Sequence, residues 1–175
     1  DEMGPTVTGR TLQVACVYGD FTPKVAERLA PDAQLDVVDV APVQLENLHR
    51  KIKGRPNVRL RHQDATDLEF ANQSFDSVVV FFLLHEQPAD VRKKTVEEAV
   101  RVVKPGGKVI FVDYHRPRNL NPFRYFMAPL LKLLEPFAMD MWRHEIQEWA
   151  PENIRNNMAK QTYFGGLYQK TVFTK

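Results

Sequence analysis

An unbroken apolar run at residues 78–84, Val-Val-Val-Phe-Phe-Leu-Leu, constrains the fold more than any other feature of the chain. The run is too short to cross a bilayer, and its β-branched and aromatic residues suit a buried strand. Strands that are apolar on both sides occur in parallel sheets that carry helices on both faces. The run therefore predicts a layered α/β domain.

Strand-like and helix-like patterns alternate along the chain around this run. Apolar runs predict strands at residues 12–17, 35–40, 58–61, 75–82 and 108–114. Helical spacing predicts helices at residues 23–30, 42–52 and 89–103. Two last strands, at 163–167 and 168–173, are expected to be joined by a tight turn. We therefore expect an open, mostly parallel, Rossmann-like sheet with an antiparallel C-terminal hairpin.

Length and composition limit the classes of function. A chain of 175 residues suits a single domain over 1–175. Its 24 basic and 22 acidic residues leave a charge of +2, which does not indicate a nucleic-acid partner, and we infer no obligate protein partner. Cys16 is the only cysteine, which favours a reducing compartment. The N-terminus shows no signal-peptide pattern and begins shortly before a strand, so we expect a piece of a longer protein.

Residues 118–150 form an insertion between the fifth strand and the hairpin. Its centre is rich in Phe, Tyr, Leu and Met, and prolines at 122, 129 and 136 exclude one straight helix. Such a segment can be ordinary core, a hydrophobic lid over an apolar substrate, or a patch that faces a membrane. Flanking Arg124, Lys132 and Arg143 suit a membrane interface.

The ends of the predicted strands carry residues typical of a nucleotide fold. Gly19 ends the first strand, and Asp39 follows 20 residues later at the end of the second. At this spacing an acid accepts hydrogen bonds from ribose hydroxyls. Asp64 and Ala65 follow the third strand, at the same expected edge of the sheet.

With the Lys-Pro-Gly-Gly sequence at 104–107, these motifs resemble the class I S-adenosylmethionine (SAM) methyltransferases over residues 12–112. The resemblance implies that a loop after the first strand wraps the methionine part of SAM. It also implies that Asp39 holds the ribose and that Asp64 faces the adenine. The implied cofactor-binding residues are Gln13, Val17, Tyr18, Gly19, Asp39, Val40, Asp64 and Ala65.

The first loop departs from the family pattern of acid-x-Gly-x-Gly-x-Gly. Gln13 stands where the family has its acid, and Ala15 and Val17 replace two of the glycines. The acid normally helps to hold the SAM amino group as an ammonium, and Gln13 carries no charge. The departure implies either that SAM binding is lost or that SAM sits differently, with a less firmly protonated amine.

Three motifs, at residues 17–22, 83–88 and 112–117, resemble one branch, the RquA family of rhodoquinone-biosynthesis proteins. This resemblance implies exchange of a ubiquinone methoxy group for an amino group, with SAM as nitrogen donor and manganese (Mn2+) as a required metal. It also implies a cytoplasmic protein, peripheral on the inner membrane. Two alternatives are a conventional methyltransferase acting on a quinone or lipophilic phenol, and a non-catalytic SAM-fold binding module.

Several titratable side chains follow the fourth and fifth strands. We expect one cavity to bring them together above the carboxyl edge of the sheet, since imidazole and carboxylate groups suit both proton transfer and manganese. A hydrogen-bonded structural role is the alternative for each histidine. The candidate catalytic residues are His85, Tyr114, His115 and His144, and the candidate metal ligands are His85, Asp113, His115 and His144.

Other polar residues are expected to have structural or solvent-facing roles. His49 and His62 are far from this edge in the predicted topology. The basic groups at 59–61 and 92–94 are interpreted as solvated faces. A nucleic-acid methyltransferase usually has an Asn/Asp-Pro-Pro-aromatic motif after strand four, and this chain has Leu-His-Glu at 84–86 instead.

Overall fold

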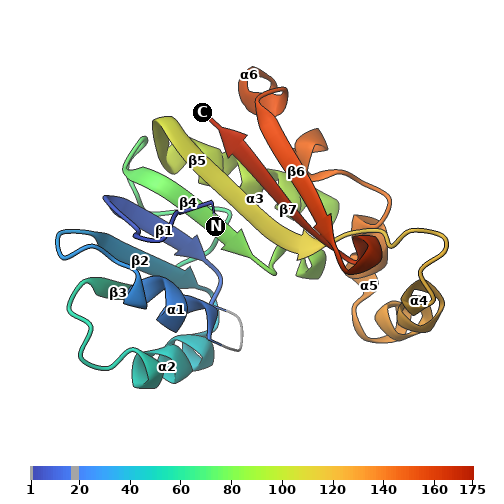
Figure 1. The fold of residues 1–175 in the computed structure, drawn as a ribbon, viewed down its shortest axis with the longest axis horizontal. Coiled ribbons are helices and arrows are strands. Elements are labelled where there is room, and N and C mark those ends of the chain that lie inside the picture. Colours follow the sequence, from blue (N-terminus) through green and yellow to red (C-terminus); the bar gives the residue numbers. More distant parts are fainter. Residues whose placement is uncertain (1, 17–19) are drawn as a thin grey trace.

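The chain forms a seven-stranded sheet in the order β3-β2-β1-β4-β5-β7-β6 (Figure 1). The computed structural model describes residues 2–16 and 20–175. The strands are β1 Arg10–Val14, β2 Gln34–Asp39, β3 Val58–His62, β4 Phe75–Phe81, β5 Val103–Tyr114, β6 Met158–Tyr163 and β7 Tyr168–Thr174. Neighbouring strands from β3 to β5 are parallel, and β7 is antiparallel to both β5 and β6. The predicted mostly parallel sheet with an antiparallel hairpin is confirmed.

Helices cover both faces of this sheet, as the apolar strands predicted. The helices are α1 Phe21–Glu27, α2 Pro42–Lys51, α3 Ala89–Val102, α4 Phe123–Leu134, α5 Pro136–Met141 and α6 Glu152–Arg155, with short 3-10 helices η1 Leu84–Glu86, η2 Ile146–Glu148 and η3 Phe164–Gly166. Helix α3 contributes Val96 and Ala99 to the buried cluster that includes the strand residue Val78. Helices α1 and α2 contribute Val25 and Leu48 to a second buried cluster.

The order of the strands reverses between β1 and β4. Strands β2 and β3 lie on one side of β1, whereas β5, β7 and β6 follow β4 on the other. Ligands of open α/β sheets bind at such a reversal, outside the carboxyl ends of the strands. The topology therefore places the candidate site beyond the ends of β1 and β4.

Two predicted boundaries at the C-terminal half of the sheet are wrong. Strand β5 starts at Val103, directly after α3, with a register shift opposite Phe75 and Ser77. The predicted loop residue Gly107 lies within β5, where a Cβ would stand 2.7 Å from the Asp76 carbonyl oxygen. The first hairpin strand ends at Tyr163, and residues 164–167 form the turn instead of a strand.

Arg92 is buried, contrary to the expectation of a solvated basic face. Its side chain is 0% exposed, and its Nε donates to the carbonyl oxygen of Leu84 in η1 at 2.8 Å. The Nη atoms donate to Phe137 O at 2.6 Å and to Asp140 Oδ2 at 2.7 Å, both in α5. The guanidinium also lies over the Trp149 ring. Arg92 therefore ties the insertion to the end of β4.

The insertion at 118–150 divides into a buried part and an exposed part. Ala138, Met141 and Trp142 of the α5 region are buried. Helix α4 lies away from the sheet (Figure 1), and Leu131 is its buried residue. Its large exposed side chains, with Leu120 just before it, are Leu120, Phe123, Tyr125, Phe126, Leu130, Leu133 and Leu134. A lid or membrane role for this segment stays a prediction.

Candidate active site

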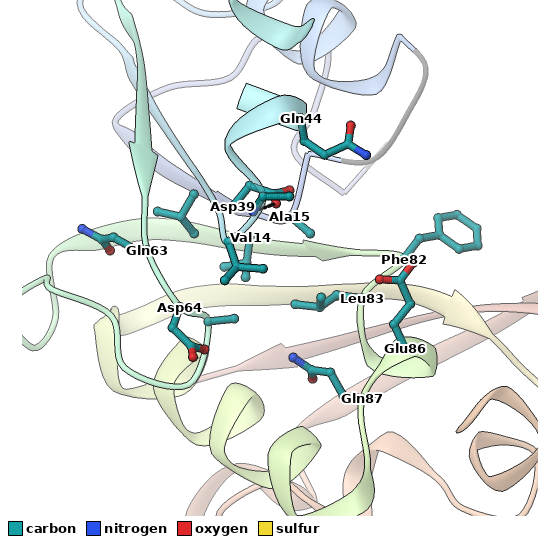
Figure 2. A pocket seen from close by; sticks show the side chains of 14 residues that line it. Val14, Ala15, Asp39, Gln44, Gln63, Asp64, Phe82, Leu83, Glu86 and Gln87 are labelled. Atoms are coloured by element: carbon teal, nitrogen blue, oxygen red, sulfur yellow. Dashed lines mark hydrogen bonds between the residues drawn. The ribbon is translucent and has the colours of Figure 1, made fainter. Parts of the chain in front are cut away.

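A cavity of about 200 Å³ lies at the strand-order reversal (Figure 2). Its walls are formed by the ends of β1 and β2, the residues that follow β3 and β4, the start of α2 and the end of η1. The lining residues are Val14, Ala15, Val38, Asp39, Val40, Ala41, Gln44, Gln63, Asp64, Ala65, Phe82, Leu83, Glu86 and Gln87. Asp39, Val40, Asp64 and Ala65, which were predicted to bind the cofactor, share this one cavity.

The two predicted carboxylates lie apart from each other in the wall of the cavity (Figure 2). Asp39 accepts the backbone N–H of Cys16 through Oδ2 and that of Ala41 through Oδ1, each at 2.8 Å. Asp64 is exposed and uses Oδ1 to accept from the backbone N–H and the hydroxyl of Thr66. Each carboxylate oxygen has two lone pairs, so both residues can accept further hydrogen bonds from a ligand.

Gln13 lies behind the cavity wall and does not line it. Its side chain is buried, where Nε2 donates to Ala15 O at 2.9 Å and Oε1 accepts from the Thr22 hydroxyl at 3.0 Å. Both polar ends of the amide are therefore satisfied inside the protein. The predicted residues Val17, Tyr18 and Gly19 lie outside the described residues.

Two non-glycine residues with left-handed backbone flank the cavity. Ala15, after β1, has a φ of 68°, and Phe82, after β4, has a φ of 51°. This conformation costs about 1–2 kcal/mol for an L-residue. Strained residues of this kind cluster at ligand sites. Ala15 therefore lines the cavity on a backbone conformation that favours glycine, the residue that the resemblance expects at this position.

His85 and Asp113 form a buried dyad next to the cavity. His85 is 5% exposed, and its Nδ1 lies 2.7 Å from Asp113 Oδ1. A carboxylate can only accept, so Nδ1 carries the proton and Nε2 is left as the acceptor of the neutral ring. Asp113 is fixed by the backbone N–H groups of Leu83, Leu84 and Tyr114. The arrangement orients one imidazole nitrogen as a general base.

Two further carboxylates, Glu86 and Glu135, face this imidazole. His85 Nε2 lies 3.9 Å from Glu86 Oε1 and 3.7 Å from Glu135 Oε2. Burial lowers the pKa of His85, but Asp113, Glu135 and Glu86 outweigh it and the net shift is upward. Burial, with repulsion from Glu135 and Asp113, raises the pKa of Glu86 despite the opposing effect of His85. Glu135 Oε2 is buried without a hydrogen-bond partner in the described structure.

Aromatic rings surround the dyad. The ring centroid of Tyr114 lies 4.3 Å from that of His85, and Phe82 and Tyr168 complete the group. Burial, followed by the charge of Glu135, raises the pKa of Tyr114 to about 12. Tyr114 is therefore a neutral hydrogen-bond donor at ordinary pH. The predicted catalytic residues His85 and Tyr114 do lie together.

His115 and His144 are not in the cavity beside the dyad, so the structure does not bring the four predicted metal ligands into one cavity. They line a second pocket, whereas His85 and Asp113 do not. His144 Nδ1 pairs with Glu148 at 2.9 Å, and His115 Nδ1 contacts Gly166 O at 2.9 Å. Over residues 2–16 and 20–175, no group of three or more His, Cys, Asp or Glu side chains is placed to hold a metal ion. The Asp113 carboxylate already accepts hydrogen bonds from three backbone N–H groups and from His85.

A profile of the family described as "Methyltransferase domain" matches residues 11–107, more than half of the chain. The chain belongs to this family. The methyltransferase domain is also 29% identical over 162 residues to demethylmenaquinone methyltransferase of Staphylococcus aureus strain JH9. That match covers 91% of the chain and 66% of the relative, so the chain spans just under two thirds of the relative's length.

Solved structures share the fold of this methyltransferase domain. The N-methyltransferase NodS from Bradyrhizobium japonicum WM9 aligns with a TM-score of 0.68 at 16% identity, over 94% of the chain and 84% of NodS. A SAM-dependent methyltransferase from Aquifex aeolicus aligns with a TM-score of 0.64 at 16% identity, over 98% and 85%. The fold and the family together identify a methyltransferase domain.

The cavity fits the adenosine half of SAM. Asp39 has free acceptor capacity for ribose hydroxyls, and Asp64 for an exocyclic amine. Val40, Ala65 and Leu83 supply apolar walls for a flat base. Cys16 is buried, and burial followed by the Asp39 charge raises the pKa of its thiol to about 12, so the thiol stays protonated and unreactive.

Proposed function

We propose that this methyltransferase domain aminates ubiquinone to rhodoquinone at a membrane surface, with SAM as the nitrogen donor. The observation that carries the proposal is the His85–Asp113 dyad, whose imidazole is close to the rings of Tyr114 and of Phe82, a residue that lines the cavity. Motif resemblance to the RquA family supports the amination. The neutral Gln13 at the position of the family acid agrees with it.

The aromatic side of the dyad suits a flat, apolar ring. Phe82, Tyr114 and Tyr168 offer faces and edges against which a quinone can stack. Phe82 also lines the cavity that suits SAM, so the two substrates would meet at this residue. The neutral Tyr114 hydroxyl can donate to a quinone oxygen.

Bound SAM would supply an amino group as the nucleophile for the ring carbon that bears methoxy. His85 Nε2 would accept the proton released from nitrogen, and Asp113 would stabilise the resulting imidazolium. The new C–N bond replaces the C–O bond, and the methoxy group leaves as methanol after taking a proton. A later step must separate the nitrogen from the SAM carbon skeleton.

The manganese that the resemblance implies does not fit the residues present. The predicted ligands are divided between the dyad and the second pocket, and the described residues form no group of three or more His, Cys, Asp or Glu that could hold a metal ion. We therefore assign no step to a metal ion.

Contact with a membrane would bring the domain to a quinone whose tail stays in the bilayer. Among the described residues, no helix has both the length and the apolar character needed to cross a membrane. The exposed apolar side chains of α4 and the absence of Asp and Glu from residues 114–134 favour an anionic lipid surface instead.

A second candidate function is methyl transfer to a quinol, favoured by the 29% identity to demethylmenaquinone methyltransferase. Incubation with SAM and short-chain ubiquinone, with and without manganese, separates the candidates by mass. Amination lowers the mass of the quinone because amino replaces methoxy, whereas methylation raises it. An unchanged quinone, in the presence of bound SAM, would indicate a binding module and overturn the proposal.

A further inference from the structure

A second open pocket of about 470 Å³ lies where the insertion leaves and rejoins the sheet domain. Residues 115–119, which lead from β5 into α4, form one side of it. Residues 142–145, which follow α5, form the other. The proposed chemistry at His85 uses none of these residues.

Three arginines give this pocket a strong positive charge. The guanidinium groups of Arg116, Arg118 and Arg143 make no side-chain hydrogen bond or ion pair with any other described residue. The lining includes one carboxylate, Glu145, which is already paired with Lys160 and lies 3.6 Å from His115 Nε2. Unpaired guanidiniums that converge on one pocket are the usual recognition groups for phosphate.

One residue that lines the pocket carries an unsatisfied hydrogen-bond donor. Trp142 lines the pocket, and its Nε1–H is buried without a hydrogen-bond partner in the described structure. An unpaired buried donor costs about 1–3 kcal/mol, so an acceptor brought by a ligand would offset this cost. Trp142 Nε1 needs a hydrogen-bond acceptor, and an anion that binds to the arginines would supply one.

The pocket is continuous with the exposed apolar face of the insertion. Asn119, in its wall, accepts a hydrogen bond from Arg124, and its backbone carbonyl accepts from Tyr125 at 3.2 Å. Both partners lie in the first turns of α4. Leu120, the next residue along the chain, is almost fully exposed. A phosphate in the pocket would therefore sit beside side chains that suit the acyl region of a bilayer.

We propose that this pocket binds the phosphate of an anionic membrane phospholipid while the exposed side chains of α4 enter the lipid. The inference rests on the membrane part of the proposed function and gives it a specific headgroup site. Arg116, Arg118 and Arg143 hold the phosphate oxygens, and Trp142 Nε1 donates to the ligand. Phosphate binding would hold residues 115–119 and 142–145, where the insertion leaves and rejoins the sheet domain, at the membrane surface.

The test is binding of the full chain to phosphatidylcholine vesicles with and without phosphatidylglycerol, in the absence of quinone and SAM. The test variant is Arg116→Gln/Arg118→Gln/Arg143→Gln. The matched control, Arg50→Gln/Lys53→Gln/Arg59→Gln, removes the same charge at the α2–β3 end of the sheet, opposite to α4 (Figure 1). Circular dichroism melting verifies that all variants are folded.

The test variant is expected to lose at least about tenfold in affinity for phosphatidylglycerol vesicles, with a much smaller loss in the control. Equal losses of vesicle affinity in the two variants would show diffuse charge attraction and would overturn the proposal that this pocket binds the phosphate. Tight binding of inorganic phosphate with no preference for phosphatidylglycerol vesicles would overturn the lipid assignment. The vesicles contain no quinone, so a failure of the proposed amination cannot produce either result.

Discussion

His85 Nδ1 lies 2.7 Å from Asp113 Oδ1, and three backbone N–H groups hold that carboxylate in place. A buried imidazole that is oriented in this way has one nitrogen free to move a proton. The chemistry proposed for this protein depends on that nitrogen, and the first predictions concern its basicity.

Asp113→Asn is expected to lower turnover by at least about tenfold, because the imidazolium loses its main stabilising partner. Asp113 raises the pKa of His85, so the variant should also move the rising limb of the pH–rate profile to lower pH. Rates measured across the pH range with short-chain ubiquinone test both effects. A rising limb that stays in place in Asp113→Asn would contradict the role of His85 as base.

The same pair predicts how stability depends on pH. The folded pKa of His85 is raised above its ordinary value of 6.5. Its protonation therefore stabilises the fold fully below about pH 6.5, and this contribution is lost as the pH rises through the folded pKa. Denaturant melts of the native protein and of His85→Gln across this range should differ in slope. Parallel curves would show that His85 keeps its ordinary pKa.

Glu135→Gln should shift the pH–rate profile in the same direction as Asp113→Asn but by less. Glu135 also raises the pKa of His85, and its Oε2 lies 3.7 Å away without a hydrogen bond. Glu148→Gln is the matched control, because Glu148 pairs with His144 instead. An equal shift in both variants would exclude a specific contact between Glu135 and the dyad.

Ala15→Gly is expected to increase the free energy of unfolding by up to about 1 kcal/mol, since glycine adopts a positive φ without strain. It should also tighten SAM binding, because it removes a methyl group from the cavity wall. Ala65→Gly is the control, as Ala65 lines the same cavity and is not among the described residues with positive φ. Calorimetry of both variants decides whether Ala15 is strained.

Gln13→Asp should weaken amination while SAM affinity holds or improves. A carboxylate one hydrogen bond behind Ala15 would favour the ammonium form of the SAM amine. Gln13→Asn shortens the side chain equally without adding charge, so the difference between the two variants isolates the electrostatic effect. Equal amination rates would contradict the idea that loss of the family acid frees the amine.

Phe126→Asp/Leu130→Asp should abolish binding to vesicles, since both side chains are exposed on α4. Val43→Asp/Asn47→Asp adds the same charge to α2, at the opposite end of the sheet (Figure 1). Co-sedimentation with phosphatidylglycerol vesicles compares them. If the α4 variant retained lipid binding and quinone turnover, α4 would have no role in membrane contact.

The sequence predicted the sheet well because its signals are local. The apolar run at 78–84 and the alternating helical patterns follow from the repeat of side chains along each element. Asp39 and Asp64 could be placed because parallel strands end at a common edge. His85 and Asp113 could be expected to meet for the same reason.

Contacts made by the insertion could not be predicted in this way. Glu135 reaches His85 only because α5 packs beside η1, and its sequence signal was a lone acid between Leu134 and Pro136 at the end of an apolar helix. His115 and His144 were grouped with His85 on sequence grounds, but side-chain direction beyond a strand end is set by packing. The burial of Arg92 was missed because two of its three partners, Phe137 and Asp140, are 45 and 48 residues away along the chain.

Arg92 also limits how the insertion at 118–150 can move relative to the sheet. Its guanidinium is shared between Leu84 in η1 and Phe137 and Asp140 in α5. If α5 moved away from the sheet, the buried guanidinium of Arg92 would lose its partners in α5, which costs several kcal/mol. The base of the insertion therefore cannot act as a free hinge, and any breathing motion is confined to α4 and the loop before it. Amide hydrogens of α5 should exchange together with those of η1, in a single cooperative unit.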